Sequence, residues 1–436
     1  MRRYYLITTI FVITLLFGCV SQHETNPAQT DHATISTTIA ISESDEPRVE
    51  MSATPNDSAT ITAIRSTDSA IMTRHVVQVE NAQKVDYGWG NTLIGWDKKE
   101  GSFILLELTS FTKQELPGEK PSLGTSMPFA ISPDRTKLAY IDYLGNRNSQ
   151  LRIVLGNGTE EEIENWPTEY LWVIIGWLDN QRISLTNLES PDGTIFVFDI
   201  SSGEISEFPP FFEAETEEGE LLMTGNMAVP FVHYDASLSR VLIIRIPSDN
   251  RIINNYEFWD ADTNEILWSD TGYSGSDDRP AWSSEGSNFV VSIAPKREDQ
   301  QREYCAELYM VTNSGEQILL LNCVWGSSSW SPDGDSLATW GVECEESCAF
   351  VDQKVLNIFD ITEGKDEVYS IYPGDIEGVI STAQYPIWSP DNQFIAFTTY
   401  DGTLSPVETI ILDLTRDKAF ILPETMEVLG WMRAEP

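Results

Sequence analysis

One short pattern recurs along most of the chain and constrains its fold more than any other feature. An aromatic or small residue precedes a polar turn, and a short run rich in Leu, Ile, Val and Ala follows it. The clearest copies are residues 330–334 (WSPDG), residues 388–392 (WSPDN) and residues 132–134 (SPD), and weaker ones occur near residues 90, 178, 235 and 283. Starting at residues 90, 132, 178, 235, 283, 331 and 389, successive copies lie 42, 46, 57, 48, 48 and 58 residues apart. Such spacing is typical of β-propeller blades.

Each copy is suited to turning the chain sharply between two strands. Proline fixes φ, the aspartate side chain accepts hydrogen bonds within the turn, and Gly or Asn tolerates a left-handed backbone. A second hairpin follows in most copies, for example residues 194–200 turning at residues 202–203. No stretch shows helical periodicity. The sequence therefore predicts an all-β fold with a single β-propeller, and a two-sheet sandwich, or a pair of them, is the alternative.

The end of the chain repeats the start of a unit without the rest of it. Residues 428–431 (VLGW) are similar to residues 174–177 (IIGW), yet only five residues follow Trp431. A lone inner strand is useful where it completes a blade begun elsewhere, because the pairing removes an exposed strand edge. We therefore predict that this strand pairs with residues 75–79 or with the unit at Trp89 and closes the propeller. Seven four-stranded blades fit the spacing best, with six or eight as alternatives.

The turn residues resemble those of a known family. The WSPDG turn at residues 330–334, followed by Leu337 and Ala338, is similar to the WD-like repeat of TolB-type β-propellers. The likeness covers about residues 85–432 and implies the propeller fold, but little about function, since propellers serve many unrelated tasks. Some TolB-like propellers resemble metal-dependent lyases with clustered channel histidines. This region contains only His75 and His233, so it cannot assemble that site.

The first residues resemble a bacterial lipoprotein signal. Arg2 and Arg3 precede an apolar run that is too short for a permanent membrane-spanning helix, and Gly18 and Cys19 follow it. We predict a signal peptide over residues 1–18, lipidation of Cys19 and an extracytoplasmic location, with the protein lipid-anchored to a membrane of the bacterial cell envelope. An ordinary signal peptide with an incidental Cys is the alternative.

The segment after the signal differs in composition from the rest of the chain. Residues 19–72 are rich in Ser, Thr, Ala and acidic residues and lack apolar periodicity. Such a segment buries too little apolar surface to offset the entropy of ordering it. We predict a disordered tether over residues 19–72 and the β-propeller over residues 73–436.

The charge balance excludes one class of partner. Lys and Arg number 27 against 68 Asp and Glu, which gives a formal net charge of −41. Nucleic acids and anionic lipid surfaces attract clusters of Lys and Arg, so we predict no nucleic-acid partner. The predicted partner is a neutral or cationic protein or glycan of the envelope. The protein is predicted to be a monomer whose membrane contact is made by its N-terminal lipid.

The five cysteines suit an exported protein. Apart from Cys19, Cys305 and Cys323 flank a predicted hairpin turn, and Cys344 and Cys348 bracket a short loop. We predict both pairs as disulfides. A metal site is the rival interpretation, but zinc-type spacing and nearby histidines are missing. Residues 260–264 are superficially similar to a calcium loop, yet the bidentate Glu is absent and a plain turn is predicted. No metal and no cofactor are predicted.

Catalytic motifs are also missing. The sequence contains no G-x-S-x-G elbow, P-loop or G-x-G-x-x-G fingerprint. We therefore predict no catalytic residues and a chain that is not an enzyme. Two alternatives stay open, namely a polysaccharide hydrolase or lyase that uses channel carboxylates, and a structural component of an envelope complex.

The longer connecting segments suggest a binding face. If the tight turns lie on one face of the propeller, the longer connections lie on the opposite face, where variable loops commonly bind partners. Solvated loops without a ligand are the alternative. The candidate contact residues on this face are Arg147, Asn250, Arg251, Arg297, Glu298, Glu345 and Glu346.

Overall fold

The structure is a computed structural model that describes most of the chain from residue 62 onward. The described residues are 62–64, 72–82, 91–97, 99–116, 129–145, 148–163, 166–168, 170–187, 195–208, 231–235, 237–245, 253–274, 281–284, 286–294, 306–342, 354–371, 379–380, 385–401 and 405–433. Over these residues the fold is all-β, and no helix is long and apolar enough to cross a membrane.

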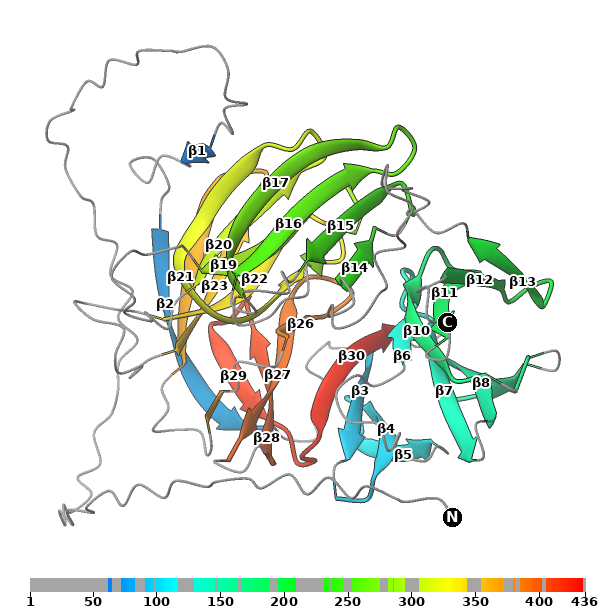
Figure 1. Cartoon of the computed structure of the whole chain (residues 1–436). Helices are drawn as coiled ribbons and strands as arrows, with labels where there is room; N and C mark the ends of the chain where they lie inside the picture. The colour runs from blue at the N-terminus through cyan, green and yellow to red at the C-terminus, as the bar shows by residue number, and fades with distance from the viewer. Residues whose placement is uncertain are drawn as a thin grey trace, which may run out of the picture. The chain divides into compact units, whose positions relative to one another are not determined.

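Antiparallel pairings sort the described strands into seven successive groups, called units 1 to 7 (Figure 1). In unit 1 the first strand comes from the end of the chain and pairs with a strand near residue 91. Unit 1 contains β30 (Glu427–Arg433), β3 (Asn91–Asp97), β4 (Ser102–Glu107) and β5 (Thr112–Leu116). Unit 2 contains β6 (Phe129–Ile131), β7 (Lys137–Gly145), β8 (Asn148–Leu155) and β9 (Glu160–Glu162). Unit 3 contains β10 (Trp172–Trp177), β11 (Arg182–Asn187), β12 (Ile195–Asp199) and β13 (Glu204–Phe208).

The remaining units follow the same order of pairing, and β21 belongs to two of them. Unit 4 contains β14 (Phe231–Tyr234), β15 (Arg240–Arg245), β16 (Ile253–Asp260) and β17 (Glu265–Ser274), and unit 5 contains β18 (Ala281–Trp282), β19 (Asn288–Ala294), β20 (Ala306–Thr312) and the start of β21 (Gln317–Trp330). Unit 6 contains the end of β21, β22 (Ser336–Val342), β23 (Lys354–Asp360) and β24 (Lys365–Ile371). Unit 7 contains β26 (Ile387–Trp388), β27 (Phe394–Tyr400), β28 (Pro406–Asp413) and β29 (Lys418–Ile421), and β25 (Val379–Ile380) also pairs with β27.

Small four-stranded sheets of this kind are typical of a β-propeller. Units 1, 2 and 3 are separate sheets, whereas units 4 to 7 form one hydrogen-bonded network of 18 strands together with β1 and β2. The network arises because β17 pairs with β19 across units 4 and 5, because β21 runs from unit 5 into unit 6, and because β2 pairs with β24 of unit 6 and β29 of unit 7. The sheets are therefore less separate than the sequence repeat predicts.

The strands before residue 82 lie on sheet edges. β1 (Thr62–Ile64) pairs in parallel with β21, although it falls within the segment predicted to be a disordered tether. β2 (Met72–Asn81) pairs in parallel with β24 through its first half and with β29 through its second half. β2 thus spans the fourth strands of units 6 and 7. Of the two predicted partners for the final strand, β30 pairs with β3, in the unit at Trp89, and not with residues 75–79.

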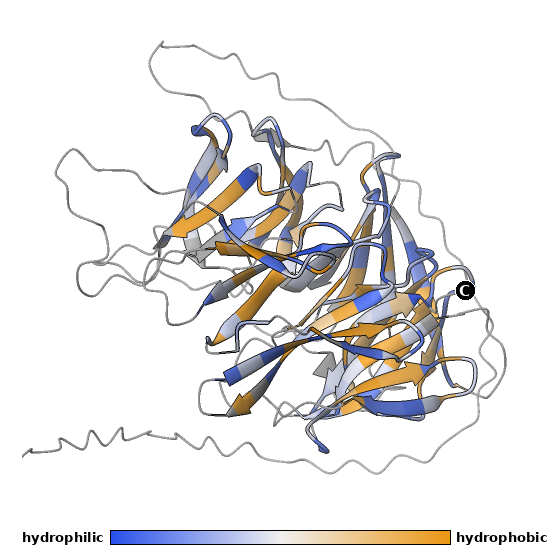
Figure 2. Cartoon of the chain, turned by 90° about the vertical axis from the view of Figure 1, so that its right-hand side faces the viewer, coloured by the Kyte–Doolittle hydropathy of each residue, from blue (hydrophilic) through white to orange (hydrophobic). Residues whose placement is uncertain are grey.

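The apolar core lies between successive sheets. Hydrophobic and hydrophilic residues both occur along the strands (Figure 2), and the buried hydrophobic side chains gather in clusters that are each shared by two units. One cluster joins units 1 and 2 through Trp96 and Tyr140, and another joins units 6 and 7 through Trp340 and Phe397. A further cluster joins unit 7 to unit 1 and contains Trp431, which is fully buried.

Candidate functional site

The turn after the first strand of a unit is held by a repeated set of hydrogen bonds. In unit 6, the Ser331 amide donates to Ser336 O (2.8 Å), and the Ser336 amide donates to Ser331 Oγ (2.9 Å). The Ser331 hydroxyl donates to Asp333 Oδ1 (2.5 Å). Ser132 in unit 2 and Ser389 in unit 7 make the same bonds. The predicted role of the Ser-Pro-Asp motif as a tight turn between two strands is confirmed.

The fifth residue of this turn has a left-handed backbone. The position is occupied by Gly286, Gly334 (φ 80°) and Asn392 (φ 61°) in units 5, 6 and 7. In units 2 and 4 it is occupied by Arg135 (φ 61°) and Leu238 (φ 62°). Gly and Asn adopt this conformation readily, whereas for most other residues it costs about 1–2 kcal/mol. Units 2 and 4 therefore place large side chains at a conformationally costly position.

Tryptophan side chains connect the first strands of neighbouring units. In each case the indole N–H donates to a backbone carbonyl of the first strand of the preceding unit, over 2.9–3.1 Å. These bonds run from Trp177 to Ala130, from Trp330 to Ala281, from Trp388 to Ser329 and from Trp431 to Ile387. The last of them connects unit 1 to unit 7.

Units 2, 4 and 5 depart from this series of bonds, and unit 4 has Tyr234 at the tryptophan position. Unit 2 has Ile131 at the tryptophan position, and a Cβ added at Gly430 would lie 1.9 Å from Ile131 Cδ1, so the isoleucine packs directly against the first strand of unit 1. In unit 5 the Trp282 Nε1 atom is buried and has no hydrogen-bond partner among the residues that the structure describes. The Trp282 ring instead packs on Phe289, with centroids 4.9 Å apart.

A cavity of about 540 Å³ lies where the first strands lead into the tight turns. All seven units contribute to its lining, which includes Trp177, Trp282, Trp330 and Trp388. The volume falls within the range of small-molecule sites, which are mostly apolar with a few polar groups. Sequence reasoning missed this cavity, because its lining is assembled from segments spread over some 300 residues.

Arg135 is the cation among the lining residues that the structure describes. Its Nη1 donates to Trp388 O (2.6 Å), so the side chain reaches from unit 2 to unit 7. Within the described part of the chain it forms no ion pair with a carboxylate. Burial lowers the pKa of Arg135 to about 10, and the positive charge of Arg433 acts in the same direction. The guanidinium therefore stays charged at neutral pH.

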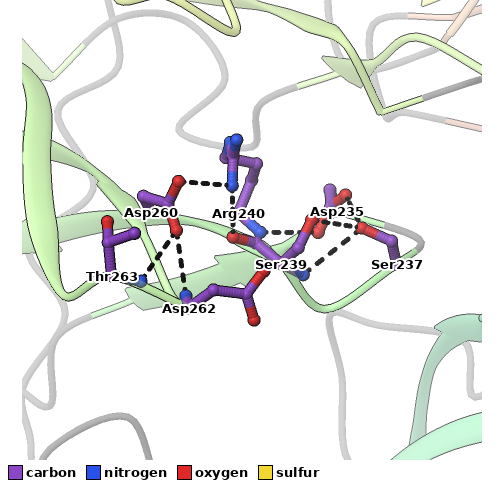
Figure 3. A network of polar contacts seen from close by, with 7 residues as sticks. All are labelled: Asp235, Ser237, Ser239, Arg240, Asp260, Asp262 and Thr263. Atoms are coloured by element: carbon purple, nitrogen blue, oxygen red, sulfur yellow. Dashed lines mark hydrogen bonds and ion pairs between the residues drawn. The ribbon is translucent and has the colours of Figure 1, made fainter.

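Asp235 is the carboxylate among the described lining residues, and it is already engaged in the turn of unit 4 (Figure 3). It accepts hydrogen bonds from the Arg240 amide (2.9 Å) and the Ser237 hydroxyl. The Arg240 guanidinium in turn pairs with Asp260 Oδ2 (2.9 Å). The backbone N–H of Thr263 and the charge of Arg240 hold the pKa of Asp260 below its usual value. Residues 260–264 are thus a strand-to-strand turn, as predicted.

The candidate contact residues chosen from the sequence all lie in connections between strands. Arg147, Asn250, Arg251, Arg297, Glu298, Glu345 and Glu346 lie outside the described residues, as do Cys19, Cys305, Cys344 and Cys348. Cys323 is disulfide-bonded, and its pairing with Cys305 stays a prediction. Where the structure does describe the chain, no group of three or more His, Cys, Asp or Glu residues could hold a metal ion.

Comparisons with known proteins concern the fold. No family model and no curated protein matches the sequence. Similar solved structures include TolB from Acinetobacter baumannii, at 13% identity over 84% of this chain and 97% of TolB, with a TM-score of 0.38. An oligogalacturonate lyase in complex with manganese is 16% identical over 76% of this chain and 88% of the lyase, with a TM-score of 0.44. An acylaminoacyl peptidase from Pyrococcus horikoshii is 15% identical over 69% of this chain and 45% of the peptidase, with a TM-score of 0.41.

These structures agree with the TolB-like β-propeller predicted from the sequence. They also correct one prediction, that the chain is not an enzyme. A peptidase and a lyase are among the proteins of similar fold, so missing motifs in a propeller do not exclude catalysis.

Proposed function

We propose that the chain is a seven-bladed β-propeller, closed by β30, that binds a protein or glycan partner at the cell envelope through the cavity at its tight-turn end. The closure is supported by three sets of contacts of β30. It pairs with β3 of unit 1, the Trp431 indole donates to Ile387 O of unit 7, and the Arg433 amide donates to Arg135 O of unit 2 (2.8 Å). Contacts to both neighbouring units are what a closing first strand requires.

A buried polar network supports the same proposal. The hydroxyls of Thr398 and Thr409 in unit 7 both donate to Met426 O (2.9 Å each), and the Val428 amide donates to Thr398 Oγ1 (3.0 Å). Thr398, Thr409 and Met426 are fully buried. Buried polar groups that satisfy one another fix a single arrangement of the strands they connect. The approach to β30 is therefore anchored on unit 7.

The observation that carries the binding function is the cavity itself. Residues of all seven units line it, four tryptophans are among them, and it contains one cation without a carboxylate partner among the described residues. Rigid inner strands position these groups, which favours recognition of a specific ligand.

The location and the anchor are proposed from the N-terminal sequence. Residues 1–18 have the pattern of a lipoprotein signal, and Cys19 is the acceptor for the lipid. We expect Cys19→Ser to release the protein from the membrane fraction. Persistence in that fraction would contradict the anchor.

A substitution that fills the cavity tests the binding function. A Cβ added at Gly176 meets no atom within 4 Å, so Gly176→Trp can fill the cavity without a backbone clash. We expect a stoichiometric partner from envelope extracts to co-purify with the full chain and to be lost with Gly176→Trp. Ile266→Trp, at a side chain 51% exposed and outside the cavity lining, is the matched control and should retain the partner. Equal retention by both variants, or no partner for the unmodified chain, would contradict the proposal.

A further inference from the structure

The tight turn of unit 2 differs from its counterparts in units 6 and 7 at two positions. It has Ile131 where they have Trp330 and Trp388, and Arg135 where they have Gly334 and Asn392. Its hydrogen bonds are the same as theirs. The turn itself therefore has no need of an arginine.

The arginine is costly at this position in two ways. Its φ of 61° is unfavourable for a long side chain. Its guanidinium is also partly buried beside another cation, Arg433, with a backbone carbonyl as its single hydrogen-bond partner among the described residues. Groups held in unfavourable conformations or uncompensated by partners cluster at functional sites.

A shortage of carboxylates does not explain the missing partner. The chain has 68 acidic residues against 27 basic ones, and other partly buried arginines have acidic partners. Arg152 pairs with both Asp142 (3.0 Å) and Glu160 (3.1 Å), and Arg240 pairs with Asp260. Arg135 lines the cavity and donates one of its five N–H groups to a carbonyl, so the others are available to a ligand.

We infer that the cavity takes a ligand bearing a carboxylate, which pairs with the Arg135 guanidinium while an apolar or aromatic body lies against Trp177, Trp330 and Trp388. This inference rests on the proposed binding function and refines it. Arginine matches a carboxylate through two parallel N–H donors, and the aromatic wall suits a planar or apolar body. The net charge predicts neutral or cationic partners for the surface as a whole, whereas the described cavity lining offers one cation, Arg135, beside one carboxylate, Asp235, that the turn of unit 4 already engages.

The rival explanation is structural, with Arg135 serving only to satisfy the Trp388 carbonyl and fill space between units 2 and 7. The two explanations differ in what they expect of Arg135→Asn, which installs the residue that unit 7 has at the same turn position. If Arg135 serves only the fold, its replacement removes a stabilising contact, and the melting temperature should fall. A ligand-binding arginine is unfavourable in the empty protein, so the melting temperature should stay the same or rise while carboxylate recognition is lost.

Matched pairs of probes test the inference. Indole-3-acetate and indole-3-acetamide represent a small ligand, and a Leu-Leu-Trp tripeptide with a free or an amidated C-terminus represents the end of a peptide. Calorimetric titration of the full chain should show that at least one carboxylate binds about tenfold or more tightly than its amide. This preference should disappear in Arg135→Asn and persist in Arg182→Gln, a change at an exposed arginine. Which pair shows the preference tells whether the ligand is a small acid or a peptide end.

Three outcomes would overturn the inference. They are equal affinity for carboxylate and amide, no binding of either, and a carboxylate preference that survives in Arg135→Asn. Loss of the envelope partner with Gly176→Trp is an independent result. If it is found while the carboxylate preference is absent, the cavity binds a partner by other chemistry, and only the present inference fails.

Discussion

Units 2 and 7 contain the same hydrogen-bonded turn but have different side chains at two of its positions. In both, a serine hydroxyl and an aspartate hold the turn, and the fifth residue has a left-handed backbone with φ near 61°. Unit 7 has Trp388 and Asn392 at the two variable positions, and unit 2 has Ile131 and Arg135. The unit 7 residues serve the fold, because the Trp388 indole bonds to unit 6.

The comparison shows which positions of the repeat are free to carry function. The serine and aspartate can exchange places, since Asp235 and Ser237 hold the turn of unit 4, and the aromatic and fifth positions vary as well, provided that neighbouring units supply the contacts between them. In unit 2 that support comes from unit 1, through the packing of Ile131 on Gly430 and the bond from the Arg433 amide to Arg135 O. Unit 2 can therefore place a cation in the cavity.

The largest effect is expected at the tryptophan position. Trp431→Ala removes a fully buried ring and its bond to Ile387 O, and should lower the free energy of unfolding by about 3–5 kcal/mol in urea titrations. Trp431→Phe keeps most of the packing and loses the hydrogen bond, so a smaller loss of about 1–2 kcal/mol is expected. A loss below about 1 kcal/mol for the alanine variant would contradict the role of β30 in closing the fold.

The backbone requirement at the fifth position is tested next. Gly334 has φ 80°, so Gly334→Ala should cost about 1–2 kcal/mol. Gly176→Ala is the control, since this glycine has an ordinary φ and open space around its Cβ, and it should change stability by less than about 0.5 kcal/mol. Equal effects on the two melting curves would show that the turn does not demand a left-handed residue.

Exchanging the fifth residues of units 2 and 7 sharpens the comparison. Asn392→Arg puts a long side chain in the left-handed region without an aromatic cavity to receive it, and it breaks the contact of Asn392 with Asp333. We expect a loss of about 1 kcal/mol. Arg135→Asn should not lower stability. If both exchanges destabilise the protein alike, the two turns are not equivalent, and the strain argument for Arg135 fails.

The smallest expected effect is the pH dependence of the unit 2 turn. Burial alone would raise the pKa of Asp134, but hydrogen bonds from the Ser132 hydroxyl and from Thr136 hold it below the usual value. A carboxyl with a lowered pKa in the folded state stabilises the protein above about pH 4, and that contribution is lost as the pH falls through the lowered pKa. The stability difference between the unmodified chain and Asp134→Asn should be constant from pH 6 to 8 and shrink below pH 4. A difference that grows in acid would contradict this sign.

The repeat predicted the parts of the fold that have local chemical causes. The Ser-Pro-Asp turns and the hairpins follow from residues that act within a few positions of one another, whereas the pairing of the last strand with the unit at Trp89 was predicted from the incomplete final repeat. β2 was missed as an edge strand, because its partners β24 and β29 lie about 300 residues away. The cavity was missed for the same reason. Arg135 did leave a signal, since an arginine follows Ser-Pro-Asp where the clearest copies have Gly or Asn.

The central claim is that the cavity binds a carboxylate through Arg135, and a crystal structure of the chain soaked with indole-3-acetate tests it most directly. We predict that the carboxylate lies about 2.7–2.9 Å from the Arg135 guanidinium nitrogens, with the indole against the tryptophan wall. An acetate group directed away from Arg135, or an empty cavity at saturating probe, would contradict it.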